Sequence, residues 1–162
     1  ATRVFTVFQL EMMNGKAYLM GGAGARQPEW DLLAKFAGAL DVVGLTSYPF
    51  LDYETPQSVP ADYYVQASSK AGMPVVLTEL GWPSRPLSSA PDSGYGGAPD
   101  EQLRFIQALP SLFSGSNVRA ALWSFPFDIG KGAPPTFESV ALRENDGTEK
   151  PALAAWRGVV AR

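Results

Sequence analysis

Three apolar runs in this chain end alike, in polar or aromatic side chains followed by a chain-breaking residue. Residues 41–50 end at a Tyr48-Pro step, residues 74–84 reach Glu79 just before a Gly-Trp-Pro turn, and residues 120–128 end in alternating aromatic and polar side chains. Continuous apolar runs are typical of buried parallel strands, whose carboxyl ends carry the chemistry of α/β folds. We therefore expect the three strand ends to face one way, with Glu79 as the best catalytic candidate.

Helical patterns alternate with these strands along the chain. The first strand begins almost at once, ends at Glu11 and is broken by Asn-Gly, and Gly72 is the expected C-terminal cap of the second helix. A Pro-, Gly- and Ser-rich segment at 83–99, directly after Glu79, is expected to be a long functional loop. The expected strands are 4–10, 42–47, 74–79 and 118–124, and the expected helices are 28–40, 60–70, 99–113 and 151–160.

Four strand-helix units with unbroken apolar strands predict a parallel sheet with right-handed crossovers. A doubly wound sheet usually shows a G-x-G-x-x-G loop after its first strand, and the glycines at 21–24 have neither that spacing nor an adjacent strand. The alternative is a (β/α)8 barrel, which needs ~250 residues for eight units. The sequence therefore predicts an α/β fold of the TIM-barrel type, with residues 1–162 forming one half-barrel domain of four βα units.

Composition narrows the classes of partner. The chain has 162 residues, 46% of them apolar, which is enough to bury a core. Its net charge is −3 and its 13 basic residues are scattered, so nucleic acid is not an expected partner. It has no apolar stretch near the ~20 residues that span a bilayer and no signal-peptide pattern at its start, so no membrane partner is expected.

The chain contains neither His nor Cys. A Ser-His-Asp triad, a Cys-His dyad and a His-ligated zinc site are therefore excluded for this chain alone. What remains is carboxylate, Lys, Arg, Tyr and hydroxyl chemistry, which suits acid, base and nucleophile roles for carboxylates. No spacing resembles a calcium loop, and we expect neither a metal nor an obligatory cofactor.

Three segments resemble consecutive strands of one enzyme clan, the retaining (β/α)8 glycoside hydrolases that carry catalytic glutamates on strands four and seven. Residues 75–83, Val-Val-Leu-Thr-Glu-Leu-Gly-Trp-Pro, resemble strand seven, residues 44–49 resemble strand six, and Leu-Trp-Ser-Phe at 122–125 resembles strand eight. The Gly-x-x-Lys-Pro phrase within 146–156 resembles the start of the closing helix. The resemblance covers about residues 40 to 160, and residues 4–11 fit strand five.

This resemblance implies a role for each matched residue. Glu79 would be the nucleophile, Tyr48 would steady it, and Trp123 would form the floor of the sugar subsite beside the scissile bond. The implied substrate is a β-linked polysaccharide or oligosaccharide. An extracellular or periplasmic location is plausible from the family analogy alone.

One element of the clan pattern is missing. The acid/base glutamate usually follows an Asn at the end of strand four, and this chain has no Asn-Glu dipeptide. Retaining hydrolysis needs two carboxyl groups ~5 to 5.5 Å apart. Glu11 lies two strands from Glu79 by strand order, whereas the clan separates its two glutamates by three, so we expect Glu11 to have a supporting or sugar-binding role. The chain is interpreted as the C-terminal half of such an enzyme.

Two further residues are candidates for substrate binding. Trp82, in the turn after Glu79, could stack on a sugar or could only pack the loop. Asp52, like Glu54 on the loop after the second strand, could reach a substrate hydroxyl, although loop carboxylates are usually solvated.

A half-barrel has two open sheet edges and an apolar inner face, which predicts a partner. The partner is either the missing N-terminal half-barrel or a second copy in a homodimer, and the sequence does not choose between them. Two rival functions also stay open: a non-catalytic carbohydrate-binding or assembly half-barrel, and a small α/β enzyme acting on a phosphorylated substrate. The lack of a phosphate-binding glycine loop argues against the last.

Overall fold

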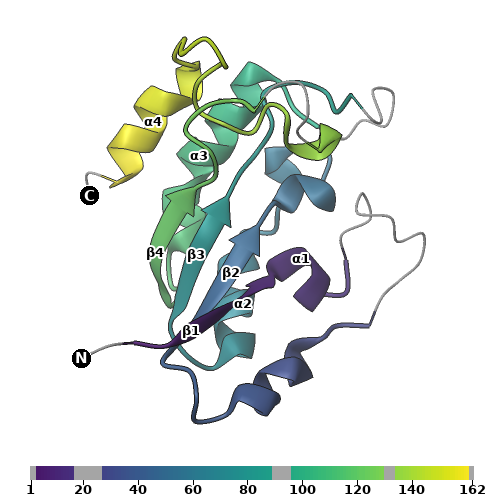
Figure 1. Cartoon of the computed structure of the whole chain (residues 1–162), viewed down its shortest axis with the longest axis vertical. Helices are drawn as coiled ribbons and strands as arrows, with labels where there is room; N and C mark the ends of the chain where they lie inside the picture. The colour runs from purple at the N-terminus through teal and green to yellow at the C-terminus, as the bar shows by residue number, and fades with distance from the viewer. Residues whose placement is uncertain (1–2, 17–26, 89–95, 130–133, 161–162) are drawn as a thin grey trace.

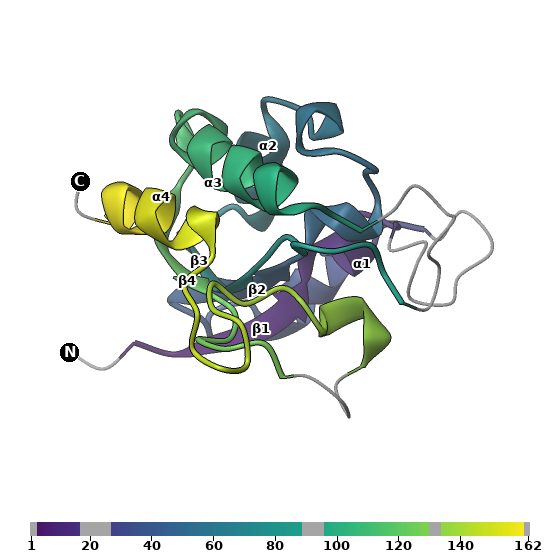
Figure 2. The same ribbon diagram turned by 90° about the horizontal axis from the view of Figure 1, so that it is seen from above.

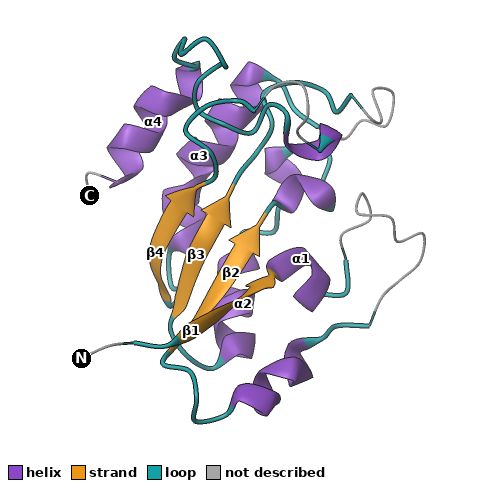
Figure 3. Ribbon diagram, in the orientation of Figure 1, coloured by secondary structure: helices purple, strands orange, loops and turns teal. Residues whose placement is uncertain are grey.

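The computed structural model describes residues 3–16, 27–88, 96–129 and 134–160, which contain one four-stranded parallel sheet (Figure 1). All four arrows point the same way in Figure 3. The spatial order β1-β2-β3-β4 follows the order in the sequence, as in successive barrel units, whereas a doubly wound sheet reverses direction at a switch point. The strands are β1 (Phe5–Gln9), β2 (Val42–Ser47), β3 (Val75–Leu80) and β4 (Val118–Trp123).

Three helices line one face of this sheet, as the view from above shows (Figure 2). They are α2 (Tyr63–Ala71), α3 (Pro99–Phe113) and α4 (Pro151–Val160). A one-turn helix, α1 (Leu10–Met13), follows β1 directly, and short 3₁₀ helices lie at Trp30–Phe36, Pro49–Leu51, Pro56–Ser58 and Pro135–Phe137. In the part of the chain that the structure describes, no helix is long and apolar enough to cross a bilayer.

The hydrophobic core lies between the sheet and these helices. Alternate side chains of β2 and β3 point toward the helices, and buried side chains of α3 belong to the same core. The fully buried members from these three elements are Val43, Leu45, Leu77, Leu80, Phe105, Ile106 and Leu109. This packing fixes the strand ends, and with them the loops that carry the candidate site.

The opposite face of the sheet leaves large apolar side chains exposed. Phe5 is 51% exposed, Val7 44% and Leu122 57%, and all three lie on the two outer strands. On the inner strand β2, Gly44 lets the side chains of Phe5 and Val7 lie close over its backbone. In a closed barrel this face would be the interior, so its exposure here is what a half-barrel fold requires.

Most expected elements are confirmed within one or two residues, but the first helix is wrong. Within residues 28–40 only the 3₁₀ helix Trp30–Phe36 forms. Gly38 then adopts a left-handed φ of +77°, so the backbone does not continue as a helix. The second helix begins at Tyr63 rather than at 60, and its cap at Gly72 is confirmed by a φ of +66° and an N–H bond to Ser68. The glycine loop at 21–24 and the middle of the loop at 83–99 lie outside the described residues.

Candidate functional site

Glu79 is the penultimate residue of β3, at the carboxyl edge of the sheet, and its side chain is exposed. The pairing register shifts on both sides of this position, between Leu45 and Thr46 toward β2 and between Leu77 and Leu80 toward β4. Such irregularities change the direction in which a side chain leaves the strand. The exposed carboxylate can therefore meet a ligand above the sheet while the next residue, Leu80, stays in the core.

Tyr48 holds this carboxylate from the adjacent strand end. Its hydroxyl donates to Glu79 Oε2 at 2.6 Å and lies 2.7 Å from Ser124 Oγ, which comes from the end of β4. The Tyr48 side chain is only 3% exposed, and its ring packs edge-on against Phe50 and Phe137. Burial, followed by the hydrogen bond to Glu79, raises the pKa of Tyr48 above its ordinary value, so the phenol keeps its proton.

Gly81 makes room for the Tyr48 ring. A Cβ at Gly81 would lie 3.0 Å from Tyr48 Cε1 and would also collide with the side chain of Val140. The Gly in the Gly-Trp-Pro turn therefore has a packing reason that the sequence alone did not reveal.

The strand end that carries Ser124 is strained. Phe125, the next residue, has a φ of +60° and is the only non-glycine residue with positive φ among those described. This conformation is costly for a bulky side chain and is often found at functional sites. Sequence reasoning did not single out Ser124, and its position directly after Trp123 at a strand end was the available signal.

Glu11 was expected to bind sugar or support the site, and the structure corrects the sugar-binding part. Its carboxylate is 0% exposed, so it cannot touch a substrate in this conformation. Oε1 accepts hydrogen bonds from the Tyr48 backbone N–H at 2.9 Å, the Tyr63 hydroxyl at 2.9 Å and Ser47 Oγ at 3.3 Å. Burial raises the pKa of Glu11 to about 7, against the opposing effect of these hydrogen bonds.

Trp82 was expected to bind substrate, and the structure corrects this as well. Its ring is 0% exposed and packs between Phe105, at a centroid distance of 5.1 Å, and Phe50, at 6.2 Å. Gln102 of α3 donates its side-chain amide to the Trp82 carbonyl at 2.8 Å. Trp82 therefore connects the turn after Glu79 to the helix layer. Burying its large apolar ring in the core stabilises the fold more than exposing it to solvent at the edge of the sheet would.

Trp123 was expected to be the floor of a sugar subsite, but its ring lies on the helix side of the sheet. It contacts Trp156 of α4 at 5.5 Å and Phe105 of α3 at 6.3 Å, and its indole N–H donates to the Val140 carbonyl at 2.9 Å. Its ladder partner Leu80 belongs to the same core. This expectation is corrected because alternation along β4 directs Leu122, and not Trp123, to the open face.

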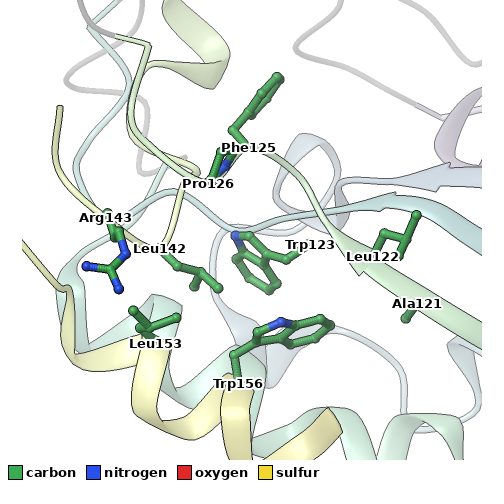
Figure 4. A pocket seen from close by; sticks show the side chains of 9 residues that line it. All are labelled: Ala121, Leu122, Trp123, Phe125, Pro126, Leu142, Arg143, Leu153 and Trp156. Carbon is green, nitrogen blue, oxygen red and sulfur yellow. The ribbon is translucent and has the colours of Figure 1, made fainter. Parts of the chain in front are cut away.

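A cavity of about 410 Å³ opens beside Trp123, along the outer edge of β4 (Figure 4). Figure 4 shows the neighbouring rings of Trp123 and Trp156 in its lining, with Leu142 and Leu153 nearby, while Phe125 points away. Glu79 and Tyr48 do not line this cavity. It belongs to the free edge of the sheet and not to the carboxylate site.

Asp52 was a candidate for substrate binding, and the structure places it next to the buried Glu11. It follows the 3₁₀ turn Pro49–Leu51, is 9% exposed, and its backbone N–H bonds to the Pro49 carbonyl. Its negative charge contributes to the raised pKa of Glu11.

The Gly-x-x-Lys-Pro motif also has a structural role. Lys150, immediately before α4, bonds both carboxylate oxygens of Asp128 at 2.7 Å, and the two side chains are only 3% and 2% exposed. Asp128 Oδ1 accepts from the Ala141 N–H, and Arg85 reaches Oδ2 from the turn after β3. This buried ion pair fastens the loop after β4 to the closing helix. Among the described residues, no group of three or more potential ligands is arranged to hold a metal ion.

No protein-family model and no curated protein sequence matches this chain. Its fold is similar to solved structures of carbohydrate-active enzymes. The Clostridium thermocellum endo-1,4-β-D-xylanase 10B superposes with a TM-score of 0.62 at 17% identity, over 98% of this chain and 29% of the xylanase chain. A Rhizomucor miehei β-1,3-glucanosyltransferase in complex with laminaritriose superposes with a TM-score of 0.59 at 17% identity, over 93% of this chain and 49% of the glucanosyltransferase chain.

A third similar structure, Ruminococcus gnavus β-glucuronidase, gives a TM-score of 0.57 at 12% identity, over 98% of this chain and 26% of the enzyme. This chain therefore spans between about a quarter and a half of the chains it resembles. At these identities the likeness shows the fold alone. The chain has an α/β fold that corresponds to part of the (β/α)8 barrel of glycoside hydrolases.

Proposed function

We propose that this chain carries the nucleophile half of a retaining glycoside hydrolase site that acts on a β-linked polysaccharide or oligosaccharide. The observation that carries the proposal is the exposed Glu79 carboxylate, held by the buried Tyr48 hydroxyl at 2.6 Å at the carboxyl edge of the sheet. The structural similarity to carbohydrate-active barrels supports the fold of such a site. The substrate class and the roles rest on the clan resemblance of the strand ends.

The chemistry assigned to Glu79 is attack on the anomeric carbon. Its carboxylate oxygen forms a bond to that carbon while the glycosidic C–O bond breaks and its electron pair leaves with the aglycone oxygen. The Tyr48 hydroxyl restricts the Glu79 side chain to one orientation, which lowers the entropy lost in reaching the reactive geometry. Ser124 in turn orients the Tyr48 hydroxyl.

The proposed site still lacks the carboxyl group that acts as general acid and then as general base. A retaining site needs a second carboxyl group ~5 to 5.5 Å from the nucleophile, and the buried Glu11 is engaged with Tyr48 and Tyr63. The proposal therefore requires a carboxylic acid from a further half-barrel, either an N-terminal half or a second copy. The open face and free edges of β1 and β4 are compatible with such a partner.

The rival hypothesis of a non-catalytic carbohydrate-binding half-barrel would need exposed aromatic rings as a platform. Trp82 and Trp123, the two tryptophans that could have provided one, pack into the core and the helix layer instead. The burial of Trp82 and the packing of Trp123 against the helix layer support the catalytic proposal over the platform.

The test uses a substrate that needs no acid. A dinitrophenyl 2-deoxy-2-fluoro-β-glycoside carries a leaving group that departs without protonation, so Glu79 alone can form the glycosyl ester. We expect intact mass spectrometry, across a panel of such sugars, to show addition of one fluoroglycosyl group, and peptide mapping to place it on Glu79. Glu79→Gln should abolish the addition, whereas Glu54→Gln, at an exposed loop carboxylate, should not.

Failure of every sugar to label the folded chain, or labelling that survives Glu79→Gln, would overturn the nucleophile assignment. Light scattering on the same sample gives the mass of the assembly. A dimer that also hydrolyses aryl β-glycosides would mean that a second copy of this chain supplies the acid/base carboxyl group.

A further inference from the structure

Glu11 is the most heavily engaged buried polar group near the candidate site. It lies in α1, directly after β1, and is completely enclosed. Its Oε1 accepts from Tyr48, Tyr63 and Ser47, and its Oε2 accepts from the Gln9 side-chain amide at 3.1 Å. A buried carboxylate that collects this many donors holds together segments that are distant in sequence.

The contact with Tyr48 is made to its backbone. Tyr48 leaves β2 with a φ of −132° and a ψ of 72°, and Pro49, which follows, has no N–H. Glu11 Oε1 accepts the Tyr48 N–H at 2.9 Å, while the Tyr48 hydroxyl is fixed at the far end by Glu79 and Ser124. Tyr48 is therefore held at both ends, and Glu11 holds the end away from the ligand.

We propose that Glu11 is a positioning residue that acts on Glu79 through Tyr48, and that Tyr48 responds to the protonation state of Glu11. The effect of Glu11 on catalysis rests on the proposed function of Glu79. The link between Glu11 and Tyr48 can be measured without any turnover of substrate. Glu11 touches no surface that a substrate reaches, so it is not a catalytic residue in this role.

The surroundings of Glu11 favour a change of charge near neutral pH. The titratable groups that act on it are the carboxylate of Asp52 and the phenols of Tyr48, Tyr63 and Tyr64. Burial and the charge of Asp52 favour the neutral acid, whereas the donors favour the carboxylate, and the pKa is about 7.

Gln9 can accommodate the protonated form. Its amide N–H donates to Glu11 Oε2, while its Oε1 is buried and has no hydrogen-bond partner among the described residues. Rotation of this amide by about 180° would present Oε1 as an acceptor to a proton on Glu11 Oε2. Protonation also weakens the charge-assisted bond from the Tyr48 N–H, so the hold on Tyr48 differs between the two states.

The test follows Tyr48 by NMR in the full chain with tyrosine labelled with carbon-13 at Cζ. The Tyr48 resonance is assigned by its loss in Tyr48→Phe. Because the phenol keeps its proton, we expect any inflection near pH 7 to report Glu11. The inflection should disappear in Glu11→Gln and persist in Glu79→Gln.

Tyr63→Phe supplies a milder variant should Glu11→Gln fail to fold. It removes one hydroxyl that stabilises the Glu11 carboxylate, so the Tyr48 inflection should move to higher pH. A Tyr48 resonance that stays flat across this range, or an inflection that Tyr63→Phe leaves in place, would overturn the proposal. If Glu79 failed to form a glycosyl ester while these titrations held, the proposed function would fall and the positioning link would stand.

Discussion

The Tyr48 hydroxyl donates a 2.6 Å hydrogen bond to Glu79 Oε2, joining two strand ends that are 31 residues apart in sequence. The bond links adjacent parallel strands at their carboxyl ends, which is where an α/β sheet presents reactive side chains. Tyr48 is buried and Glu79 is exposed, so a rigid group orients a group that a ligand can reach.

Tyr48→Phe tests this bond directly. Removing a hydrogen bond to a charged group costs about 1.5–3 kcal/mol, which corresponds to a ten- to hundredfold loss where the bond orients a reacting atom. We expect the rate of Glu79 labelling by the activated fluoroglycoside to fall by that factor. Tyr53→Phe removes a hydroxyl that bonds Lys16 instead, and should leave the rate unchanged. Equal rates in the two variants would show that Tyr48 does not assist Glu79.

Gly81→Ala should damage the same site through packing. The added methyl group would press on the Tyr48 ring and on Val140, and overpacking of a core typically costs about 1–3 kcal/mol. We expect lower thermal stability together with slower labelling of Glu79. Gly158→Ala is the matched control, because a Cβ there meets nothing within 4 Å and Gly158 lies in α4.

The control should gain about 0.5–1 kcal/mol from the better helix propensity of Ala. Loss of stability in both variants to the same extent would mean that the glycine at 81 has no specific relation to Tyr48.

The strand positions were predictable from the sequence because apolar runs broken by Pro and Gly are strong local signals. The location of Glu79 at a strand end and its closeness to Tyr48 follow from two adjacent parallel strands. The first helix was not predictable in the same way. Its apolar spacing was helical, yet Gly38 ends the path, and the 3₁₀ turn that forms has no fully buried residue.

Local sequence patterns also did not predict which way the aromatic side chains point. A strand that is apolar on both faces does not tell which residues face the helices, so Trp123 was placed on the wrong side. Trp82 lies in a turn and packs against Gln102 and Phe105, which are about 20 residues further along the chain. Glu11 was recognised as a candidate, but the donors that enclose it come from the end of β2, from the residue after it and from α2, which are distant in sequence.

Lys150→Met should destabilise the fold strongly. It would leave the Asp128 carboxylate, which is only 2% exposed, without its bidentate partner, and breaking a buried pair typically costs about 3–5 kcal/mol. Chemical denaturation measures the free energy of unfolding. Arg85, whose side chain is 51% exposed, is the outer partner of Asp128. Arg85→Met should therefore lower the free energy of unfolding by less than about 1 kcal/mol.

Replacing both members of the pair, in Lys150→Met with Asp128→Leu, should recover much of the lost stability because no charge is then buried alone. A double variant as unstable as Lys150→Met would show that the loss comes from packing of the lysine stem and not from the unpaired carboxylate.

The raised pKa of Glu11 makes stability depend on pH in a definite direction. The pKa rises from 4.5 to about 7 on folding, so between these values the folded state binds more protons than the unfolded state. The contribution of Glu11 is therefore fully present below pH 4.5 and is lost as the pH rises through 7. The difference of about 2.5 pH units corresponds to about 3 kcal/mol.

Other groups titrate in the same range, so the measurement compares the wild-type chain with Glu11→Gln at each pH. Between pH 4.5 and 8, we expect the unfolding free energy of the wild type to fall by about 3 kcal/mol relative to the variant, because Gln does not ionise. A constant difference across this range would mean that Glu11 keeps one charge state throughout. A difference that grows with pH would mean that its pKa is lowered on folding, as for a carboxylate stabilised mainly by its donors.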